Sequence, residues 1–271
     1  FCSKECTANL KVVCVMLEPE SKGINMKKIL KWILILLIAA GAFVCGAFLF
    51  RGWRDSKTVE QSAPLEQICQ TVMSSENYVP YDQLPKDLVN ATIAVEDARY
   101  YTHGAVDFFS AARAVASQVL PYLQKSGGST IAQQTVKNLY QYYSGGLEWK
   151  GAELFLAIKL EKLYTKDEIL ALYVNIINYG DDYTGIREAA NGYFQCAPIQ
   201  LNMEECTLLA GIPQSPANMQ LSNHFDAAKA KQKIVLEAMV RSEYITQQQA
   251  DEIYARPIWY VAYGAWRQGL A

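Results

Sequence analysis

The chain has 271 residues, a formal net charge of −2 and a charged fraction of 19%, and 51% of its residues are hydrophobic. This length accommodates one substantial domain together with a membrane anchor, and the hydrophobic content excludes a disordered chain. The nearly balanced charge gives no basic field of the kind that attracts nucleic acid, so we expect no nucleic-acid partner.

An apolar run near the N-terminus predicts a single transmembrane helix. Residues 32–50 carry no charged side chain, and at about 1.5 Å per residue they reach roughly 28 Å, close to the hydrocarbon thickness of a bilayer. Because no small-residue cleavage signal follows, we interpret 29–50 as an uncleaved anchor; a cleaved signal peptide is the alternative. Lysines before the run favour an internal N-terminus only slightly, because the basic residues after it dilute this bias. Residues 1–25 show no periodicity, and their origin stays open.

After the anchor, a polar connector over 51–80 leads into residues 81–271, which we predict to be mainly α-helical. No well-alternating strand pattern competes with the helical periodicity there. Several helix starts carry N-cap signals, in which a side-chain oxygen accepts from the first free amides of the helix. These are capping boxes at Thr165–Glu168, Asn202–Glu205 and Thr246–Gln249, and Asp226 as the cap of the following AAKAKQKIVLEAMV segment.

Three polar clusters interrupt the apolar helical sequence. Each has a structural explanation when taken alone: an exposed helix end, a turn with an N-cap, and a solvated pair at i and i+3. The clusters are Glu96-Asp97 with Tyr100, His103 and Asp107; Gly127 to Gln134 with Lys137 and Asn138; and Lys150 with Glu153.

In this order the clusters resemble the peptidoglycan glycosyltransferases of glycosyltransferase family 51. The family pattern runs E-D-x-x-F-x-x-H, G-G-S-T-I-x-Q-Q, R-K-x-x-E and K-x-x-I-L-x-x-Y-L-N. The resemblance covers roughly residues 80–250, and GGSTIAQQTVKN is its most specific string. The sequence contains no S-x-x-K and no K-T-G, the motifs of penicillin-binding transpeptidases. The matching segments are Glu96–His103, Gly127–Gln134, Lys150–Glu153, Lys166–Asn175, Gly185–Phe194 and Leu209–Pro216.

The resemblance implies a lysozyme-like helical domain that polymerises lipid II. The 4-hydroxyl of one lipid II attacks the anomeric carbon of the growing chain, displaces undecaprenyl diphosphate and converts an α linkage into a β-1,4 bond. It also implies a single-pass protein of the bacterial cell membrane with its catalytic domain outside. The implied partners are lipid II, the growing glycan, and the membrane, on which the apolar region around Phe108 and Phe109 rests. Penicillin-binding transpeptidases and other cell-wall proteins are further candidates.

Site roles follow from the resemblance together with the chemistry. A sugar hydroxyl needs a proton acceptor, which by resemblance is Glu96. The diphosphate needs neutralisation more than protonation, so Lys137 and Lys150 are its candidate partners, and Glu153 is the second catalytic carboxylate, orienting a lysine or a metal. No cofactor is required by the sequence, although Mg²⁺ or Mn²⁺ near Glu153 is a candidate. The other predicted substrate-binding residues are Asp97, Tyr100, Gly128, Ser129, Thr130, Gln133, Gln134 and Asn138.

The sequence departs from the family pattern at several places, of which Tyr100 in place of phenylalanine is a mild one. Trp149 replaces the arginine of R-K-x-x-E, and Ala105 replaces the glycine of H-x-G. Lys231-Gln232 stands where the family often has paired arginines, which we interpret as a structural difference. Arg99, Arg113 or a metal could supply the cation that Trp149 removes. Two other functions stay open: a lysozyme-like enzyme that cleaves glycan, and a non-catalytic scaffold that binds lipid II.

Overall fold

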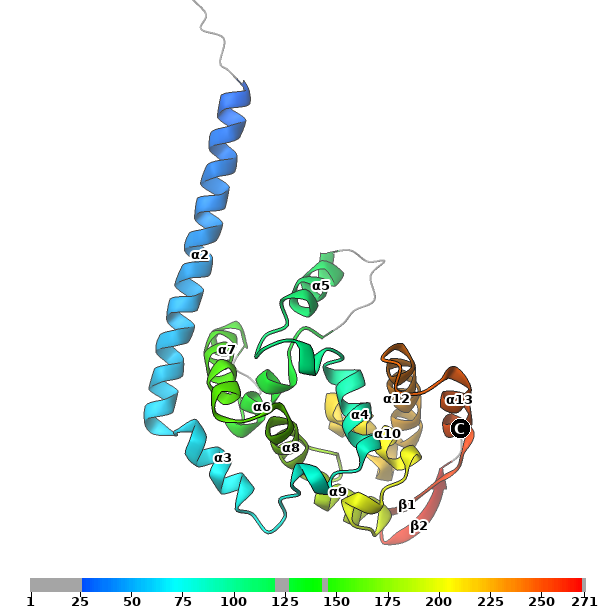
Figure 1. The fold of residues 1–271 in the computed structure, drawn as a ribbon. Helices are drawn as coiled ribbons and strands as arrows, with labels where there is room; N and C mark the ends of the chain where they lie inside the picture. Colours follow the sequence, from blue (N-terminus) through cyan, green and yellow to red (C-terminus); the bar gives the residue numbers. More distant parts are fainter. Residues whose placement is uncertain (1–25, 120–126, 143–145, 270–271) are drawn as a thin grey trace, which may run out of the picture. The chain divides into compact units, whose positions relative to one another are not determined.

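The computed structural model describes residues 26–119, 127–142 and 146–269, and the chain divides into two compact units, 1–48 and 49–271. Its elements carry the labels of Figure 1, which begin at α2. The helices are α2 (Met26–Ser62), α3 (Leu65–Met73), α4 (Lys86–Glu96), α5 (Phe108–Val119), α6 (Ile131–Leu139), α7 (Gly146–Leu163), α8 (Lys166–Ile176), α9 (Ile186–Phe194), α10 (Met203–Gly211), α11 (Pro216–Met219), α12 (Leu221–Arg241) and α13 (Gln247–Ala255). Short 3₁₀ turns lie at Tyr81–Gln83, Tyr100–Thr102, Pro198–Gln200 and Ile212–Gln214, and two strands, β1 (Ile258–Ala262) and β2 (Ala265–Gly269), follow.

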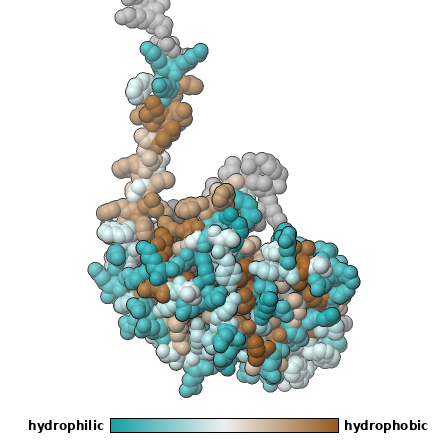
Figure 2. Space-filling view, viewed as in Figure 1, coloured by the Kyte–Doolittle hydropathy of each residue, from teal (hydrophilic) through white to brown (hydrophobic). Residues whose placement is uncertain are grey.

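The long helix α2 contains the predicted anchor. It is long and apolar enough to cross a membrane, with a mean hydropathy of 2.8 over its most apolar stretch. Figure 2 shows apolar residues on the visible face of this helix. The helix does not end with the apolar run: residues 51–62 of the predicted connector continue it. No proline lies between Met26 and Pro64, so the backbone hydrogen bonds continue through the polar stretch.

The second unit is mainly α-helical, as predicted, and is built around two packed groups of helices. In one, α4, α10 and α12 pack against one another; in the other, α6 packs against α7 and α8. Helix α8 lies in the middle of the ribbon in Figure 1, and Leu170, Leu172 and Tyr173 on it are at most 1% exposed. Burial of such side chains on several faces of α8 makes it a central support of the domain.

The predicted capping boxes are confirmed at the starts of α8, α10 and α13, and a fourth lies at the start of α6, where Thr130 pairs with Gln133. The prediction that Asp226 caps a helix is wrong. Helix α12 begins earlier, at Leu221, and bends at His224, where φ is −134° and ψ is 36°. A residue outside the helix stabilises this early start, because the amide of Ser222 donates to Oδ2 of Asp181 at 3.1 Å.

The strands form an antiparallel hairpin that the sequence analysis did not predict. Ile258 pairs with Gly269, and the chain reverses at Tyr263 and Gly264, both of which have positive φ. The inward face of β1 carries Tyr260, whose ring stacks on Phe225 of α12 at 4.8 Å. The outward face carries exposed aromatic residues such as Trp259, so apolar and polar residues do not alternate, and the usual signal of a strand is missing.

Candidate active site

A cavity of about 760 Å³ opens between the end of α4, the 127–130 segment, α7 and α12. Most of the predicted site residues meet there although they come from three separate stretches of sequence. The ones that line the cavity are Glu96, Asp97, Gly128, Ser129, Thr130, Gln134, Lys137, Lys150 and Glu153.

Glu96 is the last residue of α4, and its carboxylate meets α6. Oε2 of Glu96 accepts a hydrogen bond of 2.7 Å from Nε2 of Gln134. Burial raises the pKa of Glu96 above its ordinary value, while the Gln134 bond and the positive charges of Lys231 and Lys137 oppose that rise. A carboxylate with a raised pKa is a stronger base, and here it faces a cavity large enough for sugar rings.

Asp97, the next residue, joins the end of α4 to the start of α6. Its Oδ1 lies 2.6 Å from Nε2 of His103, and its Oδ2 accepts from the amide of Ile131 at 3.0 Å. Beside it the hydroxyl of Thr130 donates to the carbonyl of Ala105 at 2.7 Å. These bonds fix the position of Glu96 relative to the 127–130 segment. They also place a carboxylate at the positive end of α6, where an anion is stabilised.

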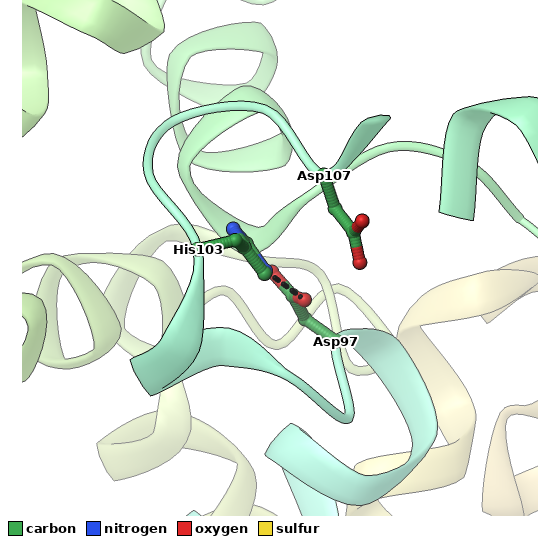
Figure 3. Close-up of side chains that lie close together, drawn as sticks. All are labelled: Asp97, His103 and Asp107. Atoms are coloured by element: carbon green, nitrogen blue, oxygen red, sulfur yellow. Dashed lines mark hydrogen bonds and ion pairs between the residues drawn. The ribbon is translucent and has the colours of Figure 1, made fainter. Parts of the chain in front are cut away.

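Asp97, His103 and Asp107 lie together, with potential metal-ligand atoms within 4.8 Å of one another (Figure 3). Each of them is already engaged. Asp107 caps α5 by accepting from the amide of Ser110 at 3.0 Å and from its hydroxyl at 2.7 Å, and it pairs with Arg99. Burial raises the pKa of Asp107, but the bonds from Ser110 and Arg99 outweigh burial and hold it well below its ordinary value. The geometry is that of a structural bridge rather than an open metal site.

Lys150 and Glu153 line the opposite side of the cavity from α7. Their side chains form an ion pair, and Nζ of Lys150 also donates to the hydroxyl of Ser129 at 2.9 Å. Glu153 is 1% exposed, and burial raises its pKa while Lys150 and Lys137 oppose the rise. Among the described residues, the group with three potential metal ligands does not include Glu153.

Gly128 is required by packing at the edge of the cavity. A Cβ at this position would lie 2.9 Å from the Cβ of Ala114 and 3.3 Å from the Cα of Ala111, both on α5. Only glycine allows the segment before α6 to approach α5 this closely.

Three predicted substrate-binding residues lie outside the cavity. Tyr100 is 1% exposed, and its hydroxyl donates to the carbonyl of Lys166 at 2.6 Å. Gln133 is buried and closes the capping box at Thr130. Asn138 lies on another face of α6 and lines a second cavity of about 410 Å³. Their side chains support the helices that carry the site.

Helix α12 contributes a cavity residue whose role was not predicted from the sequence. Lys231 is 8% exposed, lines the cavity, and donates from its ammonium group to Oε1 of Gln214. Burial lowers its pKa, and the charge of Glu96 opposes that change. The signal was present: Lys231 lies three residues after Ala228 and four before Val235, on the buried face of the helix. A lysine on such a face needs a partner or a function.

Trp149 does not line the cavity. It is 7% exposed, stacks on Tyr142 at 4.1 Å and meets Tyr140 edge to face at 5.9 Å. The position therefore serves packing here and supplies no charge. The cations that do line the cavity, among the described residues, are Arg99, Arg113, Lys137, Lys150, Lys231 and Arg241.

Comparison with known proteins identifies the family of this chain. The family model described as Transglycosylase matches residues 61–240, which contain all of these cavity residues except Arg241 and its neighbour Ser242. The chain belongs to the transglycosylase family.

This transglycosylase is similar to several curated proteins. It is 39% identical to penicillin-binding protein 1A of Escherichia coli over 191 residues, which is 70% of this chain and 22% of that protein. It is 32% identical to penicillin-binding protein 2D of Bacillus subtilis over 82% of this chain and 33% of that protein. A protein of Cupriavidus necator named as a candidate transglycosylase is 30% identical over 83% of this chain and 94% of that protein.

The transglycosylase thus spans about a third or less of these penicillin-binding proteins, but nearly all of the Cupriavidus protein. Among solved structures, penicillin-binding protein 1A of Haemophilus influenzae matches with a TM-score of 0.42 and 19% identity, over 68% of this chain and 18% of that one.

Proposed function

We propose that this transglycosylase polymerises lipid II into β-1,4-linked glycan strands, with inversion at the anomeric carbon and release of undecaprenyl diphosphate. The observation that carries the proposal is the Glu96 carboxylate, held by Gln134 on one wall of a cavity whose other walls carry Lys150 and Lys231. A base beside several cations matches a reaction that removes a proton from an alcohol and releases an anionic diphosphate.

Glu96 is the proposed base for the 4-hydroxyl of the acceptor sugar. Its raised pKa strengthens the carboxylate as a proton acceptor, and the Gln134 bond holds one oxygen so that the other is available to the substrate. General-base catalysis of this kind typically contributes about 10²–10⁴ in rate. The proton passes from the hydroxyl to Glu96 as the new glycosidic bond forms and the bond to the diphosphate breaks.

Neutralisation of the diphosphate is assigned to lysine side chains rather than to the start of α6. Asp97 accepts from the amide of Ile131, and the amides of Thr130 and Gln133 bond within the capping box. The anion position at this helix start is therefore filled by the protein's own carboxylate. Lys137 and Lys150 remain as point charges for the phosphates, with Glu153 holding Lys150 in place.

The same proposal covers location and partners. An α2 long enough to cross a bilayer, together with relatives named as penicillin-binding proteins, supports a single-pass protein of the bacterial cell membrane with the cavity on the extracytoplasmic side. The proposed partners are lipid II, the growing glycan chain, and cell-wall proteins that include transpeptidases.

The test is a polymerisation assay of the full chain in detergent micelles with lipid II as substrate, and glycan length is read by gel electrophoresis. We expect Glu96→Gln to lower the polymerisation rate by a factor of about 10²–10⁴. Glu76→Gln, at an exposed glutamate, serves as the matched control and should keep the wild-type rate. Undiminished polymerisation by Glu96→Gln would contradict the assignment of the base.

Two parallel assays separate the alternative functions. Shortening of mature sacculi without polymerisation of lipid II would identify a lysozyme-like enzyme. Lipid II binding without either activity would identify a scaffold.

A further inference from the structure

The polar end of α2 packs directly along α7, the helix that carries Lys150 and Glu153. Within the second unit, Gly52 of α2 touches Gly151 of α7: a Cβ built on Gly52 would lie 2.5 Å from the carbonyl carbon of Gly151 and 2.6 Å from its Cα. Farther along, the Glu60 carboxylate forms an ion pair with the Lys159 ammonium group. Glycine at both contact positions lets the two backbones meet without side chains between them.

The two contacts have the same spacing on both helices. Gly52 and Glu60 are eight residues apart, as are Gly151 and Lys159. Eight residues rise about 12 Å along a helix, so the two segments run parallel and in register for about two turns. A shift of either helix along its axis would break both contacts at once.

Further contacts bring the end of α2 into the fold of the domain. Ser56, one turn after Gly52, is 5% exposed, and Val59 packs against the main hydrophobic core. Just after the helix, the carbonyl of Ala63 accepts from the Tyr140 hydroxyl at 2.9 Å. Tyr140 in turn packs on Trp149, the residue before Lys150. The end of α2 is thus held to the domain at several points between Gly52 and Ala63.

We propose that Gly52 is a positioning residue for the transglycosylase reaction. Its contact with Gly151 sets how closely α7 approaches α2. The position of α7 in turn sets where the ammonium group of Lys150 lies beside Ser129 on the cavity wall. This inference rests on the proposed function for its kinetic readout, and on the described contacts for its structural readout.

A side chain at position 52 has no way to avoid the contact. The three atoms nearest to its Cβ are all backbone atoms of Gly151, which no rotamer change can move. Ordinary carbon–carbon contacts are about 3.5–4.0 Å, so α7 must shift by about 1 Å to admit a methyl group. Misplacement of a charged group by about 1 Å can cost about 10² in rate.

The kinetic test compares Gly52→Leu with Gly41→Leu and Gly46→Leu in the full chain in detergent micelles, with lipid II as substrate. The control glycines are on the same helix and have nothing within 4 Å. We expect kcat of Gly52→Leu to fall by about 10- to 100-fold with KM changed by less than about twofold, because Lys150 acts on charge that develops in the transition state. Wild-type kcat in Gly52→Leu would overturn the proposal.

A charge-swap series checks the same register without crowding. Glu60→Lys and Lys159→Glu should each lower kcat by about two- to fivefold, and the double variant should restore it. Rescue by the double variant shows that the pairing of the two helices, and not either charge alone, is responsible, and it keeps the test valid where Gly52→Leu does not fold. Single variants with the wild-type rate would count against the proposal.

Hydrogen exchange of the amides of residues 149–156 provides a readout independent of catalysis. We expect faster exchange in Gly52→Leu than in Gly41→Leu, and equal exchange would overturn the inference. A wild-type chain that does not polymerise lipid II contradicts the proposed function alone, and the exchange result still decides the positioning role.

Discussion

Gln134 on α6 donates a 2.7 Å hydrogen bond from Nε2 to Oε2 of Glu96 at the end of α4, and the hydroxyl of Tyr173 contacts the other end of the same amide at 3.4 Å. The amide thus connects the candidate base to the buried centre of the domain. It also stabilises the charged form of Glu96 in a place where burial disfavours that form.

Gln134→Leu tests this connection. Loss of the hydrogen bond removes an interaction that lowers the pKa of Glu96, so the pKa rises further. Glu96 then stays protonated to a higher pH, and the acidic limb of the kcat/KM profile should move upward relative to wild type. Gln67→Leu, at an exposed glutamine, is the control. An acidic limb in the same place for both variants would refute the prediction.

Lys231→Met tests the cation on α12. Lys231 is on the wall of the cavity that holds Glu96, and its charge lowers the pKa of Glu96. We expect kcat/KM at neutral pH to fall by about tenfold, with an acidic limb shifted to higher pH, and Lys231→Arg to keep most of the activity. Lys233→Met changes an exposed lysine two residues away and should behave as wild type. Equal losses at positions 231 and 233 would show that net charge, and not the position of Lys231, matters.

Asp107→Asn should weaken the fold in a pH-dependent way. The pKa of Asp107 is depressed in the folded protein, so its stabilising effect is present above the ordinary aspartate value of about 3.9 and is lost as pH falls below it. We expect Asn to cost about 1–3 kcal/mol at pH 7 and progressively less below pH 4, measured by thermal unfolding. The control is Asp82→Asn, at an exposed position. A cost independent of pH would show that the carboxylate charge is not responsible.

Trp149→Arg, which restores the arginine of the family pattern, should destabilise the protein rather than activate it. The ring is buried against Tyr140 and Tyr142, and a guanidinium group there would lose its water among aromatic rings. We expect a loss of about 2–4 kcal/mol in the free energy of unfolding. Trp149→Phe keeps the stacking and should cost less. Higher activity with unchanged stability in Trp149→Arg would mean that the side chain reaches the cavity instead.

The features predictable from sequence are those encoded over a few residues. The capping box at Thr165 is one, because cap and partner are three residues apart and the same bonds form in almost any context. The string from Gly127 to Gln134 is another, since it combines a helix cap with the polar side chains of a cavity wall. Features that depend on packing between distant segments were missed. The direction of the Tyr100 side chain is set by α8, and the exposure of Lys231 to the cavity by the crossing of α4 and α12.

The hydrogen bonds at the start of α6 have a consequence for inhibitor design. The N-terminus of a helix normally stabilises a bound phosphate or carboxylate. Here, however, Asp97 already accepts from the amide of Ile131, and the amide of Gln133 already donates to the Thr130 hydroxyl. A phosphate mimic aimed at this end of the helix would meet a carboxylate and be repelled. Compounds that direct their anionic group toward Lys150 and Lys231 instead would use the charges that the protein leaves facing the cavity.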